Sequence, residues 1–491
     1  MKTETNHFYI GREDRLIQWA GITEDNDEKN ELTEECVSKL VAKIKELIKN
    51  YLQLDNVNFL FGTGSSIHLG AASIQNIPEQ AEKDILESGN DNLKEDFKEY
   101  VQRLQKVLKG EKNPEKDEVF KDYRGWNVIF DGTYIRDYKA KIDLTDGEED
   151  MPDKHYGGIC VMYELLLNYL TAISYQKDAE NDVDGFERVH ALIDALKESL
   201  FKICDIHERQ TSERDLNRIR EKGMEDVFGK NKYIFHEKFL KSLMQRPLNL
   251  QRANIFTSNY DLAFEYAFDN LGIKYIDGFS GFHHRYFKPE TFNYDIFYPG
   301  STTAGKVQRI EKVVRYFKLH GSISWVSSKD HTHNNIYGIE EMPIELIKHK
   351  AKYDGDFGYG NLMVYPTAVK KSYTLDLPYS ELFRHFAYCT SQPQSVLFTI
   401  GYSFCDEHFN DIIYQALSNP TFTLIIVDYN GTKNAEIMRL KNLNDPRIII
   451  LEGDYLGDFL TLADTLMPDF LDTSSSDNVA QTLNTLISKV D

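Results

Sequence analysis

A glycine-rich loop is the first segment of this chain whose residue types could do chemistry. Gly62, Thr63, Gly64 and Ser66 directly follow the apolar residues 57–61. Glycines permit a tight turn and a close approach of the backbone to phosphate oxygens, and hydroxyl groups add further donors. An isolated G-x-G is more often a plain structural turn. One that lies between an apolar strand and a helix predicts a phosphate-binding loop.

Two further polar motifs follow apolar runs. Asn259 and Asp261 lie in the segment Thr-Ser-Asn-Tyr-Asp, and His320 lies in Leu-His-Gly-Ser. An amide both donates and accepts hydrogen bonds, and a histidine can act as a general base near neutral pH. Taken singly, an Asn/Asp turn and a structural histidine would explain them. Their shared position after apolar strands favours a common catalytic site.

The spacing of the apolar segments indicates the fold that must position these motifs. Near-continuous apolar runs are typical of parallel strands that are covered on both faces, and ligands of such sheets bind beyond the carboxyl ends of the strands. Every polar motif named here lies at such an end. The runs after the glycine loop are residues 253–257, 313–319, 395–400, 423–427 and 447–451.

The remaining segments predict helices around this sheet. Residues 80 to about 235 are charged and helix-rich, and we interpret them as an insertion in the α/β domain, with an independent helical domain as the alternative. We therefore expect an α/β fold, a Rossmann-like parallel sheet with a large helical insertion. The domain is expected over residues 51–470, after an N-terminal helical segment over 1–50 and before a C-terminal tail over 471–491.

Composition narrows the class of protein. The chain has 491 residues, of which 41% are hydrophobic and 12% aromatic, and this is typical of a globular protein. Its 57 basic and 78 acidic residues give a net charge of -21, which argues against direct binding of nucleic acid. Five scattered cysteines without a C-x-x-C pair, and the lack of a signal core or membrane-length apolar run, predict a cytoplasmic protein without a membrane segment.

Together, the three motifs resemble the NAD-cleaving site of the SIR2 (sirtuin) superfamily. Gly62, Gly64, Ser66 and Gly70 are in register with its G-A-G-x-S-x-x-x-G loop, residues 257–261 resemble T-Q-N-I-D, and the histidine segment resembles L-H-G. The fold implied by this resemblance is a SIR2-type Rossmann-like sheet whose first loop wraps the NAD phosphates.

The resemblance also implies roles for individual residues. Asn259 would contact the attacking water and the ribose, Asp261 would hold the nicotinamide carboxamide, and His320 would abstract a proton from a ribose hydroxyl or the water. Ser258 stands where sirtuins have a glutamine that contacts ribose. The five residues after Gly70 also depart from the sirtuin sequence I-P-D-F-R.

The C-terminal half contains a second group of matching positions. Gly401 and Ser403 resemble the sirtuin G-T-S segment and, more closely, the G-Y-S-x-x-D-x-H segment of bacterial SIR2-like proteins, which implies contacts with phosphate or ribose. Asn430 matches the ribose-binding asparagine, and Asp454 would border adenine. A hydrolase nucleophile elbow is the alternative for G-x-S, but Cys405 replaces its closing glycine. The other strand-end residues could equally be turns.

A zinc ribbon is missing from the sequence. Deacylase sirtuins carry two cysteine pairs after L-H-G, and structural zinc requires four ligands, whereas residues 327–378 contain no cysteine. His331 and His333 form one short pair without a second one. We therefore expect no metal and regard deacylation as disfavoured.

In these features the chain resembles zinc-free bacterial SIR2-like effectors of antiphage defence. This resemblance implies an NAD⁺ hydrolase that consumes NAD as its substrate and forms ADP-ribose and nicotinamide. It also implies gating by homo-oligomerisation or by an activating partner protein, a motor ATPase or another phage sensor. The alternatives are an NAD-dependent deacylase, an ADP-ribosyltransferase, and a non-catalytic sensor of NAD or ADP-ribose.

Overall fold

The computed structural model describes residues 1–22, 32–72, 77–109, 163–299, 309–328, 335–354, 357–359 and 377–468. The expected C-terminal tail over 471–491 and the histidines His331 and His333 lie outside these ranges. None of the helices within them is both long enough and apolar enough to cross a membrane.

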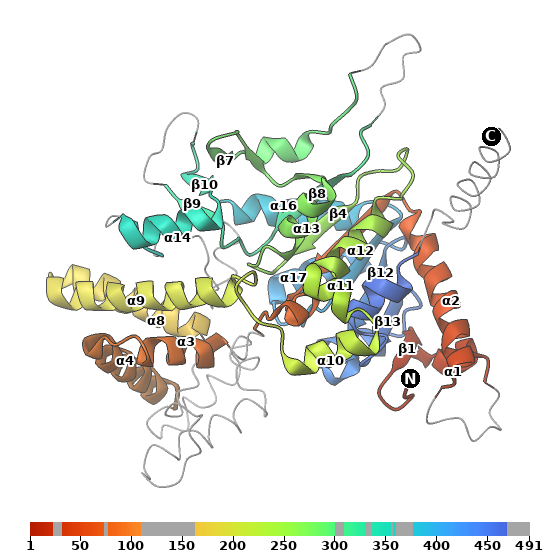
Figure 1. Ribbon diagram of the computed structural model, residues 1–491, viewed down its shortest axis with the longest axis horizontal. Helices are drawn as coiled ribbons and strands as arrows, with labels where there is room; N and C mark the ends of the chain where they lie inside the picture. The colour runs from red at the N-terminus through yellow and green to blue at the C-terminus, as the bar shows by residue number, and fades with distance from the viewer. Residues whose placement is uncertain are drawn as a thin grey trace, which may run out of the picture.

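A mostly parallel sheet forms the centre of the described structure (Figure 1). Its order is β2-β1-β13-β12-β11-β3-β4-β8-β5, and each neighbouring pair from β13 to β5 is parallel. This confirms the predicted Rossmann-like α/β fold. The strands are β1 (His7–Ile10), β2 (Glu13–Asp14), β3 (Asn56–Phe61), β4 (Asn254–Thr257), β5 (Lys274–Ile276), β8 (Val313–Lys318), β11 (Ser395–Ile400), β12 (Thr423–Asp428) and β13 (Ile448–Glu452).

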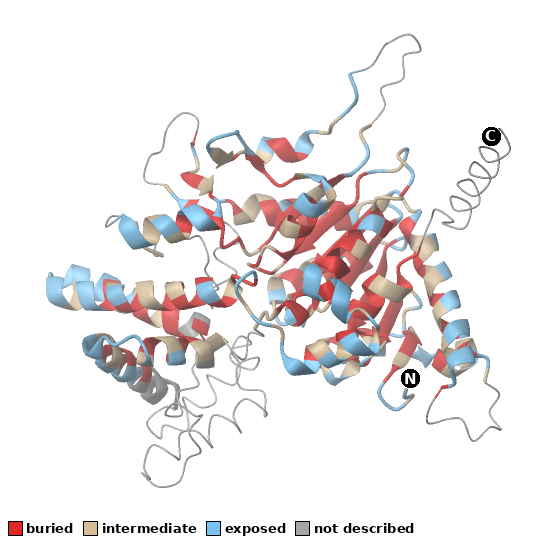
Figure 2. Cartoon of the chain, in the orientation of Figure 1, coloured by how far each residue is buried: buried red, intermediate tan, exposed pale blue. Residues whose placement is uncertain are grey.

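Helices cover both faces of this sheet. Side chains of alternating residues point to opposite faces of a strand, so Phe59 and Phe61 join one core cluster and Leu60 joins the other. Every residue of β11, β12 and β13 is buried, and Figure 2 shows burial concentrated along the strands. The first face is covered by α1 (Leu16–Ala20), α2 (Glu34–Leu52), α10 (Glu213–Glu221), α11 (Glu225–Lys230), α12 (Ile234–Leu243), α13 (Ala263–Leu271) and α19 (Phe459–Thr461), and the second by α16 (Tyr379–Ser391), α17 (Glu407–Leu417) and α18 (Ala435–Asn442).

The N-terminal segment requires a correction, because it is not only helical. The strand β1 pairs antiparallel with β13, with Phe8 opposite Leu451, and so extends the sheet. Phe8 is fully buried, and Asn6 accepts hydrogen bonds from the amides of Tyr455 and Leu456. Four residues with intermediate, buried, buried, intermediate exposure are too short a pattern to be recognised among polar neighbours. The predicted helical character of this segment is present in α1 and α2.

The predicted insertion consists of helices in its described part. Four of them, α3 (Ile77–Leu86), α4 (Asp91–Lys109), α8 (Tyr163–Ala179) and α9 (Val183–Cys204), form a lobe beside the sheet (Figure 1). Leu170, Leu192 and Leu196 belong to the core of this lobe. The helices α10 to α12 pack on the sheet instead, because Ile219 and Phe239 lie in the core of its first face.

A smaller antiparallel sheet packs against both the lobe and the main sheet. Its order is β6-β7-β10-β9, formed by β6 (Phe279–Ser280), β7 (Arg285–Phe287), β10 (Ile339–Glu341) and β9 (Trp325–Ser327), and α14 (Ile344–Tyr353) follows it. Val326 and Ile347 join the lobe core, and Trp325 joins the core of the second face. This module therefore connects the lobe to the sheet.

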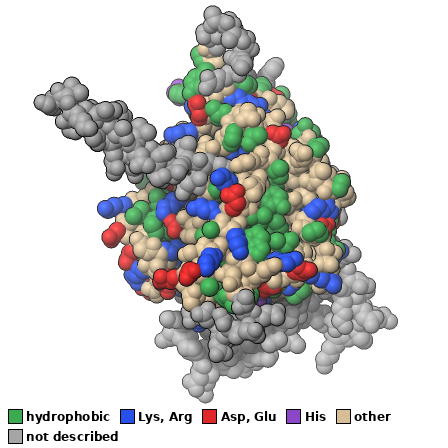
Figure 3. Space-filling view, turned by 90° about the vertical axis from the view of Figure 1, so that its right-hand side faces the viewer, with side chains coloured by type: hydrophobic (Ala, Val, Ile, Leu, Met, Phe, Trp, Pro, Cys, Tyr) green, Lys and Arg blue, Asp and Glu red, His purple; other side chains and the backbone are tan. Residues whose placement is uncertain are grey.

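Charges of both signs are interspersed on the face shown in Figure 3. That view looks on the side of the molecule where α1 and α2 lie in Figure 1.

Candidate active site

The predicted site residues lie at one edge of the sheet. Because β3, β4, β8, β11, β12 and β13 are parallel, the loops that follow them all leave the same edge. The chain passes from β3 to β4 on one side, whereas β11 pairs with β3 on the other. The glycine loop and the Gly401 loop therefore meet at a topological switch point, where open α/β sheets bind ligands.

The two glycine loops pack directly against each other at this point. The amide of Gly64 donates to the Gly401 carbonyl over 3.0 Å, and that of Gly62 donates to the Ile400 carbonyl over 3.0 Å. A Cβ atom on Gly64 would lie 2.6 Å from Gly401 Cα, and one on Gly401, whose φ is +56°, would lie 2.5 Å from Gly64 Cα. Close backbone contact between β3 and β11 thus requires these glycines, before any ligand is considered.

The amides of the first loop are already used within the protein. Besides Gly62 and Gly64, Ser65 donates to the Gly62 carbonyl over 3.0 Å and Ser66 to the Thr63 carbonyl over 2.9 Å. These four amides are therefore not free to bind a phosphate. Thr63, half-buried at its tip, is the residue whose amide and hydroxyl these bonds do not use.

Replacing Gly64 by alanine is expected to destabilise the protein by about 1–3 kcal/mol, because the added methyl group would press on backbone atoms that cannot rotate away. Urea unfolding measures this change. Gly229→Ala is the matched control, because no atom lies within 4 Å of its added Cβ and it lies in α11. An equal stability for both variants would contradict the packing explanation.

Asn259 is held in one orientation by the glycine loop. Its Nδ2 donates to the Gly62 carbonyl over 3.0 Å and lies 3.3 Å from the Ser66 hydroxyl. A carbonyl oxygen can only accept, so this bond determines which end of the amide is nitrogen. The amide oxygen Oδ1 is left buried and without a hydrogen-bond partner among the described residues. Such an acceptor is suited to a hydroxyl group or a water molecule.

Asp261 also touches the glycine loop. One oxygen accepts from the Ala263 amide over 3.0 Å, at the start of α13, and the Ser66 hydroxyl is a further donor. Burial raises the pKa of Asp261, and the Lys318 ammonium opposes that shift. The structure therefore brings Gly62, Ser66, Asn259 and Asp261 together. The Ser258 hydroxyl, by contrast, bonds to the Phe61 carbonyl at 3.4 Å.

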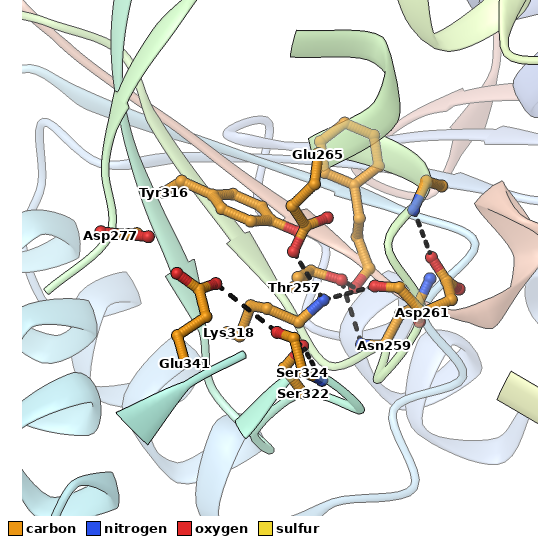
Figure 4. Close-up of polar contacts among 12 residues, drawn as sticks. Thr257, Asn259, Asp261, Glu265, Asp277, Tyr316, Lys318, Ser322, Ser324 and Glu341 are labelled. Atoms are coloured by element: carbon orange, nitrogen blue, oxygen red, sulfur yellow. Dashed lines mark hydrogen bonds and ion pairs between the residues drawn. The ribbon is translucent and has the colours of Figure 1, made fainter. Parts of the chain in front are cut away.

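A buried lysine lies beside Asp261 (Figure 4). Lys318, the last residue of β8, donates to the Asp261 backbone carbonyl and, over 3.0 Å, to Glu265 on α13. The Tyr316 hydroxyl donates to the other oxygen of Glu265 over 3.1 Å. Burial raises the pKa of Glu265, and Lys318 opposes this. Lys318 thus ties the Asp261 loop to the end of β8, two residues before His320.

The histidine loop is tied to the small sheet. The hydroxyls of Ser322 and Ser324 lie 2.8 Å apart, and Ser324 donates to Glu341 over 3.5 Å. Arg285 forms ion pairs with Glu341 and Asp277. Burial raises the pKa of Glu341 to about 8. The serine of Leu-His-Gly-Ser therefore has a structural use.

His320 faces two residues from the start of α17. Its Nε2 lies 3.5 Å from His408 Nε2 and 3.9 Å from Asp406 Oδ2. The Tyr260 ring, from the loop that also holds Asn259, lies 6.3 Å from the His320 ring between centroids. The imidazole is thus at the same edge as the amide and is surrounded by groups that the motif analysis did not assign.

Sequence reasoning missed these neighbours for different reasons. Asp406 and His408 belong to the recognised G-Y-S-x-x-D-x-H segment, so the signal was present but carried no role. Lys318 and Glu265 had a weaker signal, a charged residue inside an apolar strand and another inside an apolar helix. Buried charges usually have a partner, and this rule would have singled them out.

The residues predicted for the adenosine side are more dispersed. Ser403 and Asn430 are exposed, and the Asn430 amide donates to Asp428 over 2.9 Å. Burial raises the pKa of Asp428 to about 6. The carboxylate of Asp454 accepts hydrogen bonds from Thr5 and Asn6 and so anchors the N-terminal segment. Its predicted place beside adenine stays a prediction.

Within the described ranges, no group of three or more histidine, cysteine, aspartate or glutamate side chains is arranged to hold a metal ion. The metal expectation also stays a prediction.

Part of the chain that forms this edge of the sheet matches a known protein family. Residues 253–450 match the family model of the SIR2-like domain, and this range includes Asn259, Asp261, His320 and Ser403. No curated protein was found to match the chain. A SIR2-like domain indicates an NAD-dependent enzyme of the sirtuin superfamily. The glycine loop lies outside the matched range, yet it contacts Asn259 directly. Residues 253–450 of the chain are therefore similar to a SIR2-like domain.

Proposed function

We propose that this protein hydrolyses NAD⁺ at the bond between nicotinamide and ribose, releasing nicotinamide and ADP-ribose. The observation that supports this most directly is the buried, fixed Oδ1 of Asn259, an acceptor at the switch point of the sheet that no described residue engages in a hydrogen bond. An acceptor there can orient the attacking water or a ribose hydroxyl, and orientation accounts for much of the barrier lowering in such reactions.

The other residues have complementary roles in this proposal. The glycosidic bond breaks as its electron pair leaves with nicotinamide, and the oxygen of water bonds to the ribose carbon. His320 accepts the proton that the water loses. Asp261, close to Asn259 through Ser66, binds the carboxamide of nicotinamide. The residues at the ends of β11 and β12, Gly401, Ser403 and Asn430, border the phosphates and the adenosine.

The family context extends the proposal to biology. By analogy with zinc-free bacterial SIR2-like effectors, the protein would deplete NAD in the cytoplasm of an infected cell as part of antiphage defence. An unrestrained NADase would harm its host. We therefore propose that activity is gated by homo-oligomerisation or by a partner such as a motor ATPase or another phage sensor, with the helical lobe as a candidate contact region.

Nicotinamide release from NAD⁺ tests the reaction. Asn259→Ala is expected to lower kcat about 100- to 1000-fold, and His320→Ala to lower it by at least about 100-fold. Asn270→Ala, an exposed asparagine on α13, is the control and should retain wild-type activity. Full activity of Asn259→Ala would contradict the assignment.

Two further readouts separate the alternatives. A rate that depends on an acylated peptide or a protein acceptor would indicate a deacylase or an ADP-ribosyltransferase. If purified protein releases no nicotinamide, NAD is measured in cells that express the chain with its genomic neighbours. Depletion that is lost in Asn259→Ala would indicate a gated hydrolase, and unchanged NAD despite tight binding would indicate a sensor.

A further inference from the structure

The N-cap residue of α17 does not cap the helix with its side chain. Asp406 occupies the N-cap position, where an aspartate side chain normally accepts a hydrogen bond from a helix amide, but its side chain makes no such bond. Its Oδ2 instead lies 3.9 Å from His320 Nε2. A negative charge has been placed beside the catalytic imidazole and not on the helix end.

His408, two residues further on, faces the same nitrogen. The two Nε2 atoms lie 3.5 Å apart. If both nitrogens carried a proton, the two N–H groups would face each other at an electrostatic cost. The favourable arrangement has one N–H and one lone pair, so that one proton lies between the rings. Aromatic contacts hold both rings, because Phe409 packs against each and Phe383 packs against His408.

We propose that His408 and Asp406 are positioning residues that form a proton-sharing unit with His320. His408 orients the imidazole of His320, and the Asp406 carboxylate stabilises the positive charge that arises when His320 takes up a proton. This inference rests on the proposed hydrolysis for its catalytic consequence, whereas the coupling of the two imidazoles is a property of the protein alone.

The proposed hydrolysis releases a proton that this unit can accept. Hydrolysis of NAD⁺ by water yields nicotinamide, ADP-ribose and one proton. The proton leaves water as its oxygen bonds to ribose, passes to His320 and is shared with His408. Asp406 and His408 are of intermediate exposure, and the Asp406 side chain is 12% exposed, so solvent can take up the proton from the unit.

Two further titratable groups reach this edge from β8 and from the loop after β4. From the β4 side, the Tyr260 ring is 6.3 Å from the His320 ring between centroids. On its own strand, Lys318 directs its ammonium to Glu265 and to the Asp261 carbonyl. Asp406 and His408 are therefore the groups to change.

The pH dependence of kcat/KM for nicotinamide release is the first test. Asp406→Asn is expected to lower kcat/KM at least about tenfold and to move the acid limb of the profile to lower pH, because the nearby carboxylate favours protonated His320. His408→Gln, which keeps a polar side chain but cannot titrate, should reduce activity less than His408→Phe. Glu407→Gln has the same charge change on an exposed neighbour and should leave both the rate and the limb unchanged.

Histidine titration by NMR in the full chain, with ¹³C at the ε1 positions, is the second test and does not depend on activity. The His320 signal is expected to titrate in two steps in the wild type, in one step in His408→Gln, and at lower pH in Asp406→Asn. Identical His320 curves in all three proteins would overturn the inference, even if NAD⁺ is hydrolysed. Coupled titration without any nicotinamide release would leave the unit intact and reject the hydrolase proposal.

Discussion

Lys318→Met is expected to destabilise the protein by about 3–5 kcal/mol, the range for removal of one partner of a buried ion pair. The Lys318 side chain is 4% exposed, and its ammonium contacts Glu265 Oε1 and the Asp261 carbonyl. Methionine fills a similar volume but leaves the Glu265 carboxylate in the core without a cation. Urea denaturation followed by circular dichroism gives the free energy of unfolding.

The double variant Lys318→Met/Glu265→Gln separates charge from packing. Removing both charges should recover much of the loss, because an uncompensated buried carboxylate is the main cost. Lys274→Met, an exposed lysine on the neighbouring strand β5, is the matched control and should change stability by less than about 0.5 kcal/mol. If Lys318→Met is as stable as this control, the buried network does not stabilise the fold.

Acid is expected to lower the stability of the protein strongly, because two imidazoles near the glycine loop are buried. The rings of His68 and His236 stack 5.5 Å apart among phenylalanines, and both side chains are buried. Neither nitrogen of His236 has a hydrogen-bond partner among the described residues. Burial lowers the pKa of His236 from 6.5 to about 3 and also holds the pKa of His68 well below its usual value.

The direction of the pH dependence follows from these shifts. Above about pH 6.5 both imidazoles are neutral in the folded and the unfolded chain, and their contribution to stability is fully present. Below it the unfolded chain takes up protons that the folded protein rejects, so stability falls by up to about 1.4 kcal/mol per pH unit for each group. For His236 this loss continues to about pH 3, where the folded protein is protonated as well.

His236→Leu isolates this effect from other titrations. Buried Glu341 acts in the opposite direction, because its raised pKa of about 8 makes the folded protein bind a proton more readily than the unfolded chain. The informative quantity is therefore the difference in free energy of unfolding between His236→Leu and wild type from pH 7.5 to 4.5. As the pH falls, the variant should become more stable relative to the wild type. His283→Leu, at an exposed histidine, should show a constant difference, and a flat His236→Leu curve would refute the explanation.

The structure gives the glycine loop a role in packing that its sequence did not indicate. The loop lies after β3 as predicted, but its glycines meet Gly401 and its amides bond within the protein. Local sequence indicates a turn that needs glycine. It does not indicate whether a ligand or another loop makes the close approach, because both demands select the same residue.

The sequence by itself determined the parallel strands, the helical character of the insertion and the strand-end positions of Asn259, Asp261 and His320. These features depend on local periodicity and on the order of segments along the chain, so they can be recognised without coordinates. The short strand β1 escaped because it gains its stability from pairing with β13, more than 400 residues away. Its own four residues contain little signal.

Only the tertiary structure decided which side chains surround the motifs. His408 meets His320 across 88 residues of sequence, and Glu265 meets Lys318 across 53. Such pairs depend on strand register and helix placement, where a one-residue slip would turn a side chain to the opposite face. The residue types of the candidate site are therefore encoded locally, whereas its electrostatics arise from packing between distant segments.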